Sequence, residues 1–126
     1  MKKTEDAVLI YQKVISEYKS EDEARISAYN WLAKIYEAKR KYKEAINMYE
    51  ELLKIIKKKE IWGEEYIAPD IMFSLAMNYD CLFEYRKSIP LYKEIIEKYP
   101  NYIRIKEVKL RLKGISSLEN KEIKNK

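Results

Sequence analysis

An internal repeat is the feature that most constrains how this chain folds. When the sequence is aligned with itself at a spacing of 43 residues, apolar, small and aromatic positions coincide over a long stretch. The coinciding pairs are Leu32 with Leu75, Ala33 with Ala76, Tyr36 with Tyr79, Tyr42 with Tyr85, Ile46 with Ile89, and Tyr49 with Tyr92. A second register, at 38 residues, places Ala7, Tyr11, Val14 and Ile15 over Ala45, Tyr49, Leu52 and Leu53. Repeats of this size are typical of stacked supersecondary units, so we predict a half unit followed by two full ones.

Within each unit the apolar spacing is that of a helix. In the segment 45–56 the apolar positions recur at steps of three and four residues, which places them on one helical face; they are Ala45, Ile46, Tyr49, Leu52, Leu53 and Ile56. No segment shows the sustained alternation of a strand. We therefore predict an all-α fold with helices at about 4–19, 21–38, 42–60, 66–83, 86–99 and 101–117.

Capping and proline signals support these boundaries. The segment Ser20 to Glu23 has the form of a capping box, in which side chains satisfy the first backbone donors of a helix. Pro69 and Pro100 mark later boundaries. Pro90 is tolerated only in a first helical turn, so its helix is predicted to begin close to Arg86.

Together these patterns resemble the tetratricopeptide repeat (TPR). The first full unit supplies Tyr29, Leu32, Ala33, Tyr36, Tyr42, Ala45, Tyr49 and Leu52, and the second supplies Met72, Leu75, Ala76, Tyr79, Tyr85, Ser88, Tyr92, Ile95 and Pro100. The resemblance implies a right-handed solenoid of antiparallel helix pairs. It predicts a single TPR-like domain at 1–118: a half repeat at 4–19, repeats at about 26–60 and 69–102, and a capping helix at 101–117, before a disordered basic tail at 119–126.

Two features depart from the usual pattern. The repeat is usually about 34 residues long, so a step of 43 implies an insertion, which we place at 57–68. Such lengthened units are similar to those of kinesin light chains and of some bacterial TPR regulators. The chain also opens on a second-type helix whose face near Val8, Tyr11 and Ile15 lacks a cover. An uncovered face there would suit a structural piece of a longer solenoid or a homodimer formed through that helix.

Most of the tyrosines are predicted to pack rather than to bind. A tyrosine ring at a repeated position buries its body and keeps its hydroxyl in water. Ten of the twelve fit this scheme: Tyr11, Tyr18, Tyr29, Tyr36, Tyr42, Tyr49, Tyr79, Tyr85, Tyr92 and Tyr99. Tyr66 and Tyr102 fall outside it.

By the same resemblance, the outward face of each unit's first helix lines a concave groove that binds a protein or peptide. The predicted groove residues are Asn30, Lys34, Phe73, Met77, Arg104 and Arg111. Phe73 and Met77 form an apolar platform one turn apart, while the cations could bind a carboxylate. An ordinary solvated face is the alternative. The carboxylate clamp of chaperone-binding members is not reproduced, because Val108 occupies a position that should be basic.

Catalytic, metal and cofactor sites find little support. The chain has no histidine, two glycines and one cysteine. Imidazole chemistry, phosphate-binding glycine loops and thiolate zinc sites are therefore excluded. Cys81 has no histidine to lower its pKa, so a buried apolar role is favoured for it. We expect a protein that is not an enzyme and uses no cofactor or metal.

A second function class comes from the charge distribution. Residues 101–126 hold eight Lys/Arg and three Asp/Glu, which accounts for the whole net charge of +5 and leaves a neutral body. Lys106, Lys109, Arg111 and Lys113 form a basic patch that could follow nucleic-acid phosphates or another anionic surface. The alternative is a solubilising capping helix. Nucleic acid is the less favoured partner, since the aromatic residues are committed to packing.

The apolar runs are too short to span a membrane, which takes about 20 residues. The short basic start, Met1 to Lys3, is followed by Thr4, Glu5 and Asp6 and does not read as a signal peptide. The chain is therefore expected to be cytoplasmic, unless an export segment has been removed.

Overall fold

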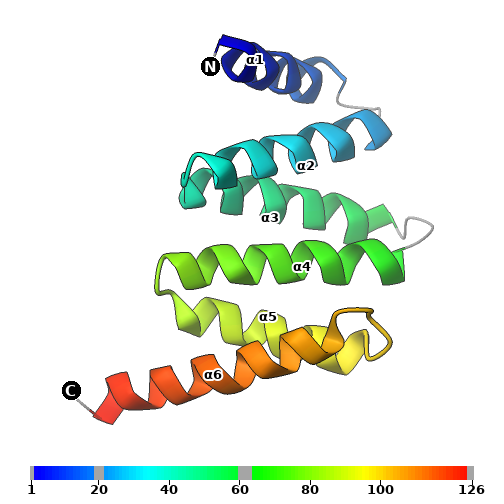
Figure 1. Ribbon diagram of the computed structural model, residues 1–126. Coiled ribbons are helices and arrows are strands. Elements are labelled where there is room, and N and C mark those ends of the chain that lie inside the picture. The colour runs from blue at the N-terminus through cyan, green and yellow to red at the C-terminus, as the bar shows by residue number, and fades with distance from the viewer. Residues whose placement is uncertain (1, 19–21, 60–63, 125–126) are drawn as a thin grey trace. The chain divides into compact units, whose positions relative to one another are not determined.

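The computed structural model describes residues 2–18, 22–59 and 64–124, with side chains described for 3–18, 23–58 and 65–118. Within these ranges the chain forms six helices and no strand (Figure 1). The helices are α1 (Lys2–Glu17), α2 (Asp22–Ala38), α3 (Tyr42–Lys59), α4 (Glu64–Cys81), α5 (Tyr85–Lys98) and α6 (Ile105–Lys124). The predicted all-α, TPR-like fold of helix pairs is confirmed.

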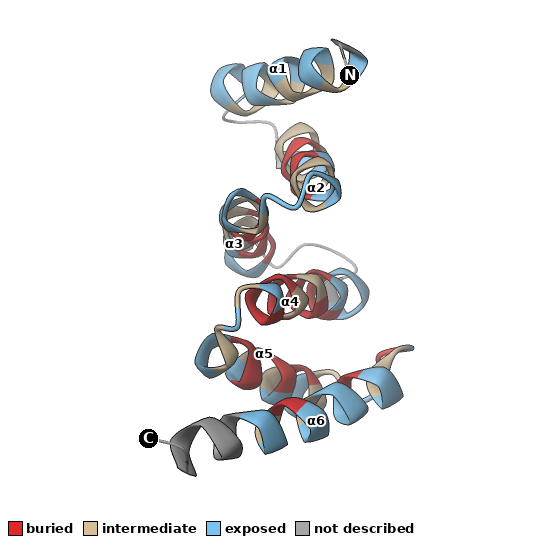
Figure 2. Cartoon of the chain, turned by 60° about the vertical axis from the view of Figure 1, so that its left-hand side comes forward, coloured by how far each residue is buried: buried red, intermediate tan, exposed pale blue. Residues whose placement is uncertain are grey.

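The helices group into two compact units, Met1–Ile61 and Trp62–Lys126. In the first unit α2 packs against both α1 and α3. In the second unit α5 packs against both α4 and α6, and α6 is exposed over much of its surface (Figure 2). Each unit therefore contains a central helix covered on two sides.

The repeated positions form the core of each unit. On the first helix of each pair, Leu32 and Ala33 are buried in the first unit, and Leu75 and Ala76 are buried in the second. On the second helix the equivalent pairs are Ile46 with Ile89 and Tyr49 with Tyr92, all of them buried. The small alanines let the paired helices approach closely, and the large side chains fill the space between them. The 43-residue register is thus a packing register.

The same register appears in the backbone turns that end α2 and α4. Arg40 and Phe83, 43 residues apart, both have positive φ, at 61° and 60°. In each turn the backbone N–H of the positive-φ residue and that of the following residue donate to carbonyls at the end of the helix. After α2 the bonds run from Arg40 N to Glu37 O and from Lys41 N to Tyr36 O. After α4 they run from Phe83 N to Asp80 O and from Glu84 N to Tyr79 O. This is the Schellman arrangement, which usually places glycine at the left-handed position. Here two non-glycine residues hold it.

Pro69 lies inside α4 and does not mark a boundary. The helix that holds Pro90 begins at Tyr85, close to Arg86 as predicted, but Pro90 lies in its second turn rather than its first. Each proline is the sixth residue of its helix. The ring of Pro69 is fully buried, so its packing offsets the loss of one helical hydrogen bond.

The predicted insertion at 57–68 is absorbed mainly by helix. Residues 57–59 complete α3 and residues 64–68 begin α4, while residues 60–63 lie outside the described part of the chain. The predicted capping box at residues 20–23 also falls largely outside it.

The last helix differs most from the prediction. It begins at Ile105 rather than at residue 101, because a turn in which Tyr102 N donates to Tyr99 O precedes it. It continues to Lys124, so most of the segment predicted as a disordered tail is helical. Its apolar stripe holds, with Val108 and Ile115 buried. None of the helices in the described ranges combines the length and apolar character that a membrane crossing requires.

Candidate functional site

A hollow in the second unit brings together most of the predicted groove residues. It has a volume of about 430 Å³ and is formed by α4, the residue before α6 and the first two turns of α6. Its lining residues are Phe73, Met77, Arg104, Glu107, Leu110 and Arg111. We call it the α4–α6 hollow.

Phe73 is the floor of the hollow. Its side chain is only 2% exposed, and its ring meets those of Tyr92 and Tyr102 edge to face at centroid distances of 5.9 and 6.4 Å. The guanidinium of Arg104 lies over the ring, 4.5 Å from its centroid. Phe73 is therefore a core residue with a covered face rather than the exposed platform that the sequence suggests.

Arg104, the residue before α6, is held in place by a carboxylate in the first turn of that helix. Its Nε and Nη2 donate to one oxygen of Glu107 at 3.1 and 2.8 Å. The hydrogen bonds to Glu107 raise the pKa of Arg104 above its ordinary value, although partial burial acts in the opposite direction. The guanidinium is fixed over Phe73 by this contact, since two bonds restrict its rotation.

A buried carboxylate of α4, that of Asp80, bonds to side chains of both α5 and α6. Tyr92 donates its hydroxyl to Asp80 Oδ2 at 2.5 Å, and Arg111 Nε donates to Asp80 Oδ2 and to the Tyr92 oxygen, both at 3.1 Å. Asp80 is 7% exposed, whereas the Arg111 side chain remains 44% exposed. Burial, and then the bond to Asp80, raise the pKa of Tyr92 well above its ordinary value.

The second carboxylate oxygen, Asp80 Oδ1, is buried and has no hydrogen-bond partner among the described residues. Asp80 Oδ2 therefore accepts both hydrogen bonds, one from the Tyr92 hydroxyl and one from Arg111 Nε. Both of these bonds of Arg111, to Asp80 and to Tyr92, use Nε, and the side chain as a whole remains 44% exposed.

Four of the six predicted groove residues lie in this hollow, namely Phe73, Met77, Arg104 and Arg111. Asn30 and Lys34 belong to the other unit, where the Lys34 ammonium lies 5.3 Å from the centre of the Trp31 ring. Leu110, 72% exposed, lines the hollow but was not among the predicted residues. The sequence gives little indication of this position, because Leu110 does not lie on the apolar stripe of α6.

The predicted basic patch is reduced by this arrangement. Lys106, Lys109 and Lys113 are exposed on α6, and their spacing of three and four residues places them along one side of the helix. Arg111 turns instead toward Asp80. Three lysines therefore remain as a stripe.

The remaining candidates are a metal site, Cys81 and Tyr102. Among the described residues, no three histidine, cysteine or carboxylate side chains gather as metal ligands would. Cys81, predicted to be buried, is exposed, because it ends α4 where the Schellman turn begins. Tyr102, outside the predicted packing scheme, is buried and donates its hydroxyl to Asp70 at 2.6 Å. Its pKa is raised by burial and by Asp70.

The comparison with protein families gives one match. Residues 26–58, which span most of α2 and nearly all of α3, match the family model described as tetratricopeptide repeat. Searches of curated proteins and of solved structures found no significant match.

Proposed function

We propose that this chain, which has a TPR-like fold and matches the tetratricopeptide repeat at residues 26–58, is a non-catalytic scaffold that binds a protein or peptide. We place the binding site in the α4–α6 hollow. The observation that carries the placement is that Arg111 is fixed at Nε by a buried carboxylate while much of its side chain stays exposed beside the hollow.

The lining favours a ligand with one apolar and one acidic group. Met77 is half-buried and Leu110 is exposed, so an apolar side chain laid between them would remove apolar surface from water. The terminal amino groups of Arg111 would then donate to a carboxylate of the same ligand. The flexible thioether of Met77 allows the pocket to adapt to different apolar groups.

Phe73→Ala is a poor test of this site, because truncating a buried aromatic side chain costs about 3–5 kcal/mol of stability. Leu110→Asp is better: the side chain is 72% exposed, and the new carboxylate would repel an acidic ligand. Leu118→Asp is the matched control, since Leu118 is also an exposed leucine of α6 but does not line the hollow.

The test is selection from a phage-displayed random peptide library on the immobilised chain, followed by anisotropy measurements with synthetic peptides. Selected peptides are expected to share a large apolar residue next to an acidic residue or a C-terminal carboxylate. Binding should be lost in Leu110→Asp and retained in Leu118→Asp. If the library yields no shared motif, or if both variants bind equally, the proposal is wrong.

The lysine stripe of α6 supports a second candidate, which is binding to nucleic acid or another polyanion. Lys106, Lys109 and Lys113 lie exposed along one side of the helix. Binding through these residues should weaken steeply as salt rises, because phosphate contacts release counterions. Lack of binding to single- and double-stranded RNA and DNA at low salt would exclude this candidate.

A further inference from the structure

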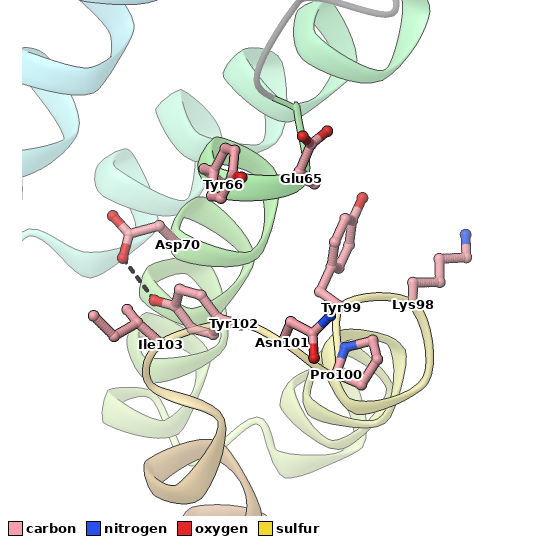
Figure 3. Close-up of a pocket in the computed structure, with 9 residues that line it drawn as sticks. All are labelled: Glu65, Tyr66, Asp70, Lys98, Tyr99, Pro100, Asn101, Tyr102 and Ile103. Carbon is pink, nitrogen blue, oxygen red and sulfur yellow. Dashed lines mark hydrogen bonds between the residues drawn. The ribbon is translucent and has the colours of Figure 1, made fainter.

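A second cavity in the same unit lies between the beginning of α4 and the connection from α5 to α6. It has a volume of about 600 Å³ and is lined mainly by carbon surface. Figure 3 shows its side chains, of which Glu65, Tyr66, Asp70, Tyr99, Tyr102 and Ile103 matter for what it can bind. We call it the tyrosine pocket. It shares no lining residue with the α4–α6 hollow.

We propose that the tyrosine pocket binds an arginine side chain of a partner polypeptide. The proposal is independent of the function assigned to the hollow, because the two sites are lined by different residues.

The charge of the pocket favours a cation. Among the described residues no ion pair neutralises Glu65 or Asp70, and Asp70 instead accepts the hydroxyl of Tyr102 at 2.6 Å. Lys98, also in the lining, is paired with Glu94 at 3.3 Å. The pocket therefore presents two carboxylates whose charge a ligand can balance.

The nearby Arg104 does not fill this role. Its charge acts on Asp70 and Tyr102, but its guanidinium is bound to Glu107 at 2.8 Å and stacked over Phe73. The same contact shows that a guanidinium packs on an aromatic ring in this part of the fold. A second guanidinium bound beside Asp70 would meet a similar environment.

The aromatic lining favours arginine over a compact cation. Tyr66, 75% exposed, lies on α4, and Tyr99 lies on the connection after α5, so two segments each add a tyrosine ring to the lining (Figure 3). A planar guanidinium stacks on such rings and still donates to carboxylates in its plane, which an ammonium does less well. The stem of the arginine would cover carbon surface of the lining.

The rim favours a residue within a chain over a free small molecule. Ile103 is 93% exposed at one side of the pocket, and Tyr66 is exposed at another. Apolar neighbours of the bound arginine could cover both of these side chains. We therefore expect the preferred peptide to carry an arginine between apolar residues.

The probe is the peptide acetyl-Leu-Arg-Leu-amide, titrated into the full chain and followed by two-dimensional amide NMR. Saturable shifts are expected at the amides of residues 65–70 and 99–103. The same peptide with citrulline in place of arginine should bind about tenfold more weakly, since it keeps the shape and loses the charge. Equal binding of the two peptides, or shifts confined to other residues, would overturn the proposal.

Two conservative substitutions test the carboxylates. Glu65→Gln and Asp70→Asn should each weaken binding about threefold, as expected for partly exposed ion pairs. Glu97→Gln, which removes an exposed carboxylate of α5 outside the pocket, should leave binding unchanged. Thermal melting of each variant checks that the fold is kept. If Glu97→Gln weakens binding as much as Asp70→Asn does, the attraction is non-specific and the assignment fails.

Discussion

Removal of one hydroxyl group tests the buried network that fixes Arg111. Tyr92→Phe keeps the ring against Phe73 but deletes the donor that lies 2.5 Å from Asp80 Oδ2. A hydrogen bond to a charged group contributes about 1.5–3 kcal/mol. Because Arg111 still donates to the same oxygen, we expect a loss of about 2 kcal/mol in the free energy of unfolding.

The charge on Asp80 is what makes this bond strong. In an Asp80→Asn background the acceptor is neutral, so Tyr92→Phe should cost only about 1 kcal/mol. Tyr85→Phe, at a half-buried position of the same helix, controls for the loss of a phenol group in general.

Urea unfolding of all the variants at neutral pH, followed by circular dichroism, gives the required differences. The network account is refuted if Tyr92→Phe lowers the free energy of unfolding by less than about 0.5 kcal/mol, which is the range of an ordinary surface substitution. It is also refuted if the cost of Tyr92→Phe is the same in both backgrounds.

Two further predictions concern titration and the backbone. The folded pKa values of Tyr92 and Tyr102 are raised above the unfolded value of about 10. Their contribution to stability is therefore complete below that pH and is lost as the pH rises above it. The variant with both tyrosines changed to Phe should show a melting temperature that falls less steeply over this alkaline range, and parallel curves would contradict the assignment. At the positive-φ position of the first Schellman turn, Arg40→Gly should stabilise the chain by about 0.5–1 kcal/mol, whereas Arg40→Ala should not. Urea midpoints of the two variants decide this, and equal midpoints would show that the turn carries no strain.

The helix pairs could be read from the sequence because their signal is local and repeated. Leu32 and Leu75 report the same packing position twice, so the register is found without any structure. The two Schellman turns obey this register too, but the sequence does not reveal them. Neither Arg40 nor Phe83 is the glycine that normally marks such a turn.

The site was only partly predictable, because periodicity shows which side of a helix a residue is on but not what covers that side. Phe73 has the spacing of an outward residue, yet Arg104 and Tyr102, from the connection before α6, close over it. The prediction for Cys81 was wrong in the opposite direction. Its apolar character suggests burial, but it ends α4 at a turn and remains exposed. For both residues of α4, burial or exposure depends on whether a segment outside α4 covers the side chain.

Phe73 also determines how the two sites of the second unit must be separated by experiment. Its ring supports the α4–α6 hollow directly as the floor, and it supports the tyrosine pocket through its edge contact with Tyr102, whose hydroxyl holds Asp70. A change at Phe73 would therefore disturb both sites together, and loss of binding would not identify which one had bound. Leu110 and Asp70 are exposed residues that each line one site only. Effects at positions with no shared partner add, so a ligand that loses affinity in one of these variants and not in the other has located its own site.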